Sequence, residues 1–146
     1  MKLDRYLITF LLVLFLGITL VGCHPKVDMM AKAEKVFIKM VDHTGAKLDL
    51  TGDQKIQLEQ LKSDIRKNFE EGRSEKREAF VKIKEDGMKE TPDIQKMTSL
   101  LQGSFRDETG RINRAFDLML DFQKNLNQDQ KKKLSKMISD WVAKWD

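Results

Sequence analysis

The chain has 146 residues, 40% of them hydrophobic and 34% charged, and its formal net charge is +4. This length suits one small domain after removal of an export signal. The basic residues are spread along the chain without interleaved aromatic residues, which argues against nucleic acid as a partner.

Residues 1–23 have the pattern of a bacterial lipoprotein signal. Two basic residues precede an apolar run over residues 6–20, as in a signal peptide, and the run is shorter than the roughly 20 residues of a transmembrane helix. Its end, Leu-Val-Gly-Cys at residues 20–23, resembles the lipobox, whose cysteine receives a lipid. We therefore expect a removed signal peptide at 1–22, a lipid on Cys23, a tether over 23–28 and a folded domain over 29–146. An ordinary secretory signal or an uncleaved anchor is the alternative.

The domain is predicted to be all-α, because apolar residues recur at three- and four-residue steps and strand signals are nearly absent. With Cys23 lipidated, no disulfide can form within one chain, so the helices must hold by packing alone. A first helix is predicted over about Met29 to Asp42, capped by Asp28 and ended by Gly45.

The second and third predicted helices are long and should form an antiparallel hairpin. The second covers Thr51 to Gly87, with a kink or short break around Gly72. The third follows Thr91 as cap, with Pro92 at its first position.

A fourth helix is predicted to begin at Asn127. Within the third helix, Gly103 and Gly110 are expected to let a neighbouring helix pack closely. Two short flanking helices leave apolar surface on the long arms, and an antiparallel homodimer would bury it.

Two segments of the chain repeat a helix-start signal. Leu-Thr-Gly-Asp-Gln at residues 50–54 and Leu-Asn-Gln-Asp-Gln at 126–130 both read as capping boxes. In each box, the side chain of the cap residue is expected to accept a hydrogen bond from the backbone N–H three residues further on. The glutamine side chain should accept one from the backbone N–H of the cap residue, and the preceding leucine should pack against the first helical turn. Each cap should stabilise its helix by about 1 kcal/mol. The residues concerned are Leu50, Thr51, Gln54, Leu126, Asn127 and Gln130.

These paired boxes resemble the twice-repeated Leu-Thr-x-x-Gln motif of the Spy/CpxP family of periplasmic proteins. The first matches in full, and the second has Asn127 for threonine, which keeps the capping chemistry. The resemblance covers about Leu48 to Trp141. It implies a cradle-shaped antiparallel dimer. Well-studied members are ATP-independent chaperones, while others inhibit an envelope-stress sensor kinase or bind zinc.

The leading hypothesis is a lipid-anchored holdase for unfolded or misfolded envelope proteins. Methionine suits varied partners because its thioether chain repacks easily, although helical spacing favours core positions for Met97, Met119 and Met137. The residues predicted for a mixed apolar and basic client surface are Met40, Lys47, Arg66, Lys67, Arg73 and Arg77.

Two other functions remain open. One is a regulatory or structural envelope lipoprotein that docks on a sensor; Trp141 and Trp145 could form its docking patch, or pack onto the hairpin. The other is a metal-binding or metal-resistance protein, but the two histidines, His24 and His43, lie far apart, so neither metal nor cofactor is expected.

Catalysis is not expected, because no nucleophile–base pair, phosphate loop or metal triad is present in the sequence. The predicted location is the periplasmic side of a bacterial membrane. By resemblance to enterobacterial lipoproteins, His24 after the cysteine favours the outer membrane.

Overall fold

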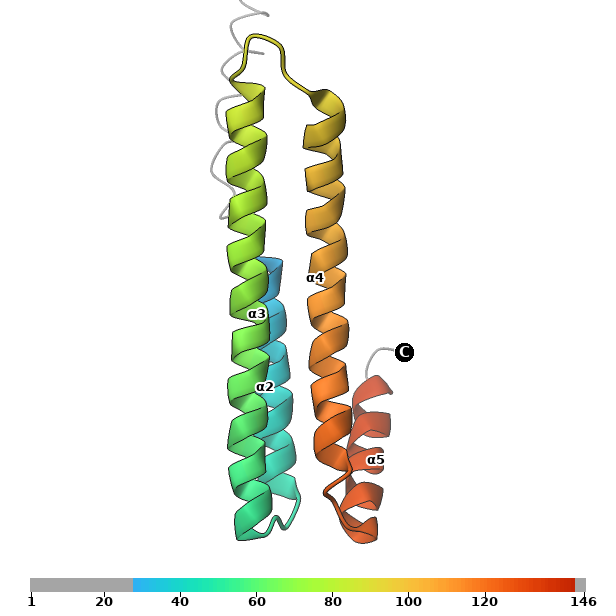
Figure 1. Ribbon diagram of the computed structural model, residues 1–146. Helices are drawn as coiled ribbons and strands as arrows, with labels where there is room; N and C mark the ends of the chain where they lie inside the picture. The colour runs from blue at the N-terminus through green and yellow to red at the C-terminus, as the bar shows by residue number, and fades with distance from the viewer. Residues whose placement is uncertain (1–27, 144–146) are drawn as a thin grey trace, which may run out of the picture.

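The computed structural model describes residues 28–143, and this part of the chain is helical, without strands (Figure 1). The helices are α2 (Met29–Lys47), α3 (Gly52–Gly87), α4 (Ile94–Gln123) and α5 (Gln128–Val142). The predicted all-α class is therefore confirmed. The predicted signal peptide, the predicted lipidation site Cys23 and most of the predicted tether lie outside the described residues, as does Trp145.

A long hairpin organises the molecule. Helices α3 and α4, of 36 and 30 residues, run antiparallel, and α3 is about 54 Å long. The shorter α2 packs along the first half of α3, and α5 folds back beside the end of α4 (Figure 1). The predicted hairpin with short flanking helices is thus present. No helix among residues 28–143 is both long enough and apolar enough to cross a membrane.

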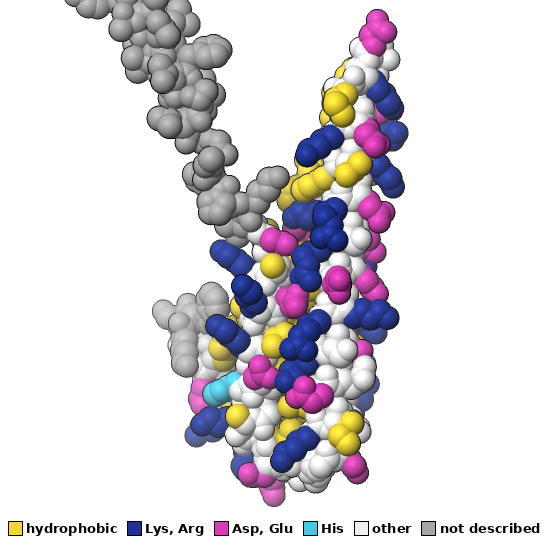
Figure 2. Space-filling model, turned by 90° about the vertical axis from the view of Figure 1, so that its left-hand side faces the viewer, with side chains coloured by type: hydrophobic (Ala, Val, Ile, Leu, Met, Phe, Trp, Pro, Cys, Tyr) yellow, Lys and Arg dark blue, Asp and Glu magenta, His cyan; other side chains and the backbone are white. Residues whose placement is uncertain are grey.

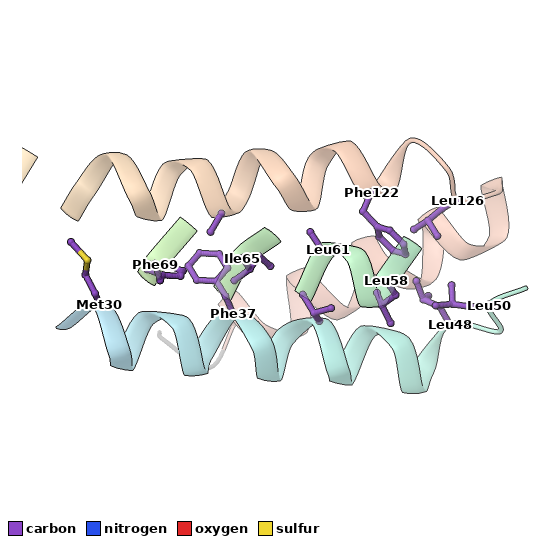
Figure 3. Packing of buried hydrophobic residues seen from close by; sticks show 12 residues of the cluster. Met30, Phe37, Leu48, Leu50, Leu58, Leu61, Ile65, Phe69, Phe122 and Leu126 are labelled. Atoms are coloured by element: carbon purple, nitrogen blue, oxygen red, sulfur yellow. The ribbon is translucent and has the colours of Figure 1, made fainter. Parts of the chain in front are cut away.

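The hydrophobic core lies where α2 packs against the hairpin. Its aromatic centre is Phe37, whose ring lies 5.8 Å from that of Phe69 and 4.8 Å from that of Phe116 between centroids. Figure 3 shows the core side chains of α2, α3 and α4 pointing toward one another. The buried hydrophobic residues are Met30, Phe37, Val41, Leu48, Leu50, Leu58, Leu61, Ile65, Phe69, Ala115, Phe122 and Leu126.

Two glycines that were expected to end or break helices lie inside them instead. Helix α2 continues through Gly45, and a Cβ there would come within 2.5 Å of Leu58 Cδ2. Helix α3 has no break at Gly72, which is buried; a Cβ would lie 2.8 Å from Met30 Sδ and 3.0 Å from Arg111 Cγ. Both glycines therefore serve the close approach of neighbouring helices.

The start and interior of α4 also differ from the prediction. Asp93, and not Thr91, caps the helix, because its carboxylate accepts from the backbone N–H of Lys96 at 2.9 Å. A Cβ at Gly103 or Gly110 would have no neighbouring atom within 4 Å among the described residues. The expectation that these two glycines admit a packed helix is therefore wrong for a single copy of the chain.

The hairpin turn is held by one buried carboxylate. Asp86 is 1% exposed; it accepts from Lys89 Nζ and, at 2.8 Å, from the backbone N–H of Asp93. The hydrogen bond from Lys89 lowers the pKa of the Asp86 carboxyl most, and the one from the Asp93 backbone lowers it further. The carboxylate thus ties the end of α3 to the cap of α4.

Candidate functional site

Both predicted capping boxes are formed. Thr51 Oγ1 accepts from the N–H of Gln54 at 3.3 Å, and Gln54 Oε1 accepts from the N–H of Thr51 at 3.0 Å. Asn127 and Gln130 make the same two hydrogen bonds, both at 2.9 Å. The cap side chains thus satisfy amide groups that the first helical turn leaves unpaired.

The glutamines of the two boxes also bind each other, which sequence reasoning missed. Gln54 Nε2 donates to Gln130 Oε1 at 3.0 Å, and Gln130 Nε2 donates to Gln54 Oε1 at 2.9 Å. Their second amide hydrogens go to the carbonyls of Asn125 and Asp49, at 2.8 and 2.9 Å. The two residues, here called the glutamine pair, therefore use their full donor capacity. The identical glutamine offset in both repeats was the only signal in the sequence.

The glutamine pair fastens the start of α5 to the start of α3. Close by, Lys133 Nζ binds Asp49 Oδ2 at 2.6 Å, and this hydrogen bond lowers the pKa of Asp49. Within α5 only Gln130 is buried. The remaining turns of α5 therefore rest on the bundle with their apolar side chains partly exposed.

A solvent-open apolar groove of about 560 Å³ lies between α5 and the helices α2 and α4. Aliphatic, aromatic and methionine side chains form most of its surface. Among the described residues, the lining includes a lysine and a histidine but no carboxylate. The lining residues are Met40, His43, Thr44, Phe116, Met119, Leu120, Gln123, Lys131, Leu134, Ser135, Met137, Ile138, Ser139 and Trp141.

The methionines are distributed differently from the prediction. Met119 packs against the core, as expected, but Met97 and Met137 are half-buried outside it. Met119 and Met137 line the groove together with Met40. Met40, predicted to contact clients, thus faces a methionine-rich surface that helical spacing alone did not reveal.

The basic residues predicted for a client surface are not gathered beside Met40. Lys47 lies exposed in the last turn of α2. Arg66, Lys67 and Arg77 are exposed on α3, a helix that is absent from the groove lining. The side of the molecule shown in Figure 2 carries basic and acidic side chains intermixed. The residues predicted for one client surface therefore lie in separate places: Met40 lines the groove, and these four basic residues lie outside it.

Arg73 has a structural contact that the prediction did not include. Its guanidinium forms an ion pair with Glu34 of α2, and both side chains are largely buried. Arg73 therefore joins α3 to α2, a contact that engages its guanidinium within the fold, and its role in client binding stays a prediction.

Metal ligands are not gathered in the described part of the chain. Among residues 28–143, no group of three or more His, Cys, Asp or Glu side chains is placed to hold a metal ion. His43 lines the groove beside apolar side chains. Comparisons with protein-family models, curated proteins and solved structures found no match to this chain.

Proposed function

We propose that this protein is an ATP-independent holdase of the Spy/CpxP type, anchored through a lipid on Cys23 to the periplasmic side of a bacterial membrane, with the outer membrane favoured. The observation that carries the proposal is the open apolar groove lined by Met40, Met119 and Met137. Methionine side chains adapt to partners of different shape, as a surface for varied unfolded segments requires.

The exposure of the groove side chains supports the same function. Leu120 is 57% exposed and Ile138 is 51% exposed, although neither position needs an apolar residue for the core. Contiguous exposed apolar surface of this kind marks binding sites in soluble domains. Apart from Gln130, no side chain of α5 is buried, so the groove side chains of this helix stay accessible to a bound segment.

The proposal includes a homodimer with two lipid anchors. Apolar side chains remain exposed on α4 away from the core, with Phe105 at 58% and Ile94 at 68% exposure, and a second copy would cover them. Each copy in the dimer would carry its own lipid anchor, and more than one acyl chain makes membrane attachment stable. Sedimentation of a chain beginning at His24 tests the dimer; a monomer at micromolar concentration contradicts it.

The holdase activity can be measured by light scattering from a reduced, unfolding client protein. The chain used begins at His24, because the core and all contacts described above lie within residues 28–143. Ile138→Gln and Leu120→Gln should each weaken suppression of aggregation. Ile56→Gln is the matched control, since Ile56 is 71% exposed on α3 and absent from the groove lining.

Two results would contradict this assignment. If the unchanged chain fails to suppress aggregation at several-fold molar excess, it is not a holdase. If Ile56→Gln weakens suppression as much as Ile138→Gln, the groove is not the client site. The anchor has a separate test: Cys23→Ser should move the protein from the membrane fraction to the soluble fraction.

A further inference from the structure

Lys131 is a half-buried cation that lines the apolar groove. Within the part of the chain that the structure describes, its ammonium group takes part in no ion pair and no side-chain hydrogen bond. Nearby Lys133, by contrast, is paired with Asp49. An ammonium group that lies beside apolar side chains and has no carboxylate partner among the described residues favours an anion as its partner.

The groove is also polarised along its length. Helices α2 and α4 end, and α5 begins, at the same end of the bundle (Figure 1). His43, Gln123 and Lys131 therefore lie toward that end, and Phe116 and Ile138 lie toward the middle of the bundle. From Lys131 to Trp141, α5 rises about 15 Å, so the apolar part of the groove extends well beyond the cation.

Shape and charge together define a ligand class. A volume of about 560 Å³ falls within the range of small-molecule sites. An elongated apolar surface with one unpaired cation at its end fits a single alkyl chain that carries an anionic head. None of the described lining residues is Asp or Glu, so they present no carboxylate that would repel such a head.

We propose that the groove binds a free fatty acid. Its alkyl chain lies along Phe116, Leu120 and Ile138, and its carboxylate accepts hydrogen bonds from Lys131 Nζ, with His43 beside it. This proposal does not depend on holdase activity. Because an unfolded client would contact the same side chains, bound fatty acid should also compete with clients for the groove.

Calorimetric titration of the detergent-free chain from His24 with laurate tests the proposal directly. We expect saturable binding of laurate, and binding of dodecanol about tenfold weaker, because the alcohol lacks the charge-assisted hydrogen bond. No client is present in this experiment, so its outcome is independent of the holdase assay.

Two lysine variants separate recognition of the carboxylate from general apolar binding. Lys131→Met should weaken laurate binding about tenfold and leave dodecanol binding unchanged. Lys132→Met is the matched control, because Lys132 is exposed and does not line the groove; it should bind laurate normally. Thermal melts monitored by circular dichroism establish that both variants are folded.

Three outcomes would overturn the proposal. One is the absence of saturable laurate binding to the unchanged chain. Another is equal affinity for laurate and dodecanol. The third is an equal loss of laurate affinity in folded Lys131→Met and Lys132→Met, which would indicate a general effect of net charge. Ile138→Gln adds a check on location, because it should weaken the binding of both ligands.

Discussion

The two ends of the hairpin are built differently. At one end, here called the base, α2 and α5 pack beside α3 and α4, and every buried hydrophobic residue of the described chain belongs to segments 30–69 or 115–126. At the other end, here called the arm and comprising residues 76–108, the buried side chains are Asp86, Ser104 and Glu108. The base is thus held by apolar burial and the arm by polar contacts.

The polar contacts of the arm join its two helices at intervals. Lys76 of α3 binds the buried Glu108 of α4 and lies 5.6 Å from the ring centroid of Phe80. Toward the turn, a shallow apolar groove of about 390 Å³ lies between the helices. Because burial of apolar area dominates folding stability, the base should supply most of the stability, while the arm keeps apolar surface open to other molecules.

The largest expected effect is a contrast between two phenylalanines of α3. Phe69 is fully buried in the base and Phe80 is 39% exposed in the arm. Phe69→Ala should lower the free energy of unfolding by about 3–5 kcal/mol, whereas Phe80→Ala should lower it by about 1 kcal/mol. Urea denaturation followed by circular dichroism measures both, and equal losses would remove the distinction between base and arm.

Removal of one member of the glutamine pair should have the next largest effect. Gln130→Ala removes a hydrogen-bond partner of the Asp49 carbonyl, the Asn127 amide and the Gln54 side chain. The substitution should therefore lower the free energy of unfolding by about 2 kcal/mol. Gln128→Ala, at an exposed position of the same turn, is the control.

A double-mutant cycle isolates the contact between the two glutamines. If they are coupled, Gln54→Ala combined with Gln130→Ala should cost less than the sum of the single losses, by about 1 kcal/mol. Additive losses would show that each glutamine acts only as a helix cap.

Alanine substitutions of Gly72 in the base and Gly103 in the arm should change the free energy of unfolding by smaller amounts and in opposite directions. Gly72→Ala should destabilise the protein by about 1 kcal/mol, because its methyl group would press on Met30 and Arg111 at the base. Gly103→Ala in the arm should stabilise it by about 1 kcal/mol, since alanine favours helix and meets no neighbouring atom there. Destabilisation by Gly103→Ala would instead indicate a packed partner, such as a second copy, on this face of α4.

The smallest effect concerns the turn of the arm and depends on pH. The hydrogen bonds from Lys89 and Asp93 lower the pKa of Asp86 in the folded state. Its stabilising contribution is therefore present above its unfolded pKa of about 4 and is lost as the pH falls through the folded value. Asp86→Asn should lower the melting temperature at neutral pH, and the difference from the unchanged chain should shrink in acid. A constant difference would contradict the role of the ionised carboxylate.

Local signals were sufficient to predict the four helices and the starts of α2, α3 and α5. Thr51 and Asn127 act on amide groups within three residues along the chain, so their capping could be read from the sequence. The long hairpin was also predictable, because its helices carry apolar residues at helical spacing and are joined by a short polar turn.

Contacts between distant segments could not be predicted in the same way. Gly45 and Gly72 read as a helix stop and a break, because glycine has low helix propensity. Their neighbours Leu58 and Met30 come from other helices, so their packing role was not visible. The ion pair of Arg73 with Glu34 joins residues 39 positions apart in the chain, so no local pattern indicates it.

The all-helical class, the four helices of the described chain and the two capping boxes follow from local sequence, because they depend on interactions within a few residues. Tertiary contacts alone establish that the two boxes meet through Gln54 and Gln130 and that Met40 joins Met119 and Met137 in one groove. They also place Lys131 at this groove, where it has no counter-ion among residues 28–143. These features arise where α5 folds back beside α2 and α4. The pairing of surfaces far apart in the chain leaves no periodic signal in the sequence.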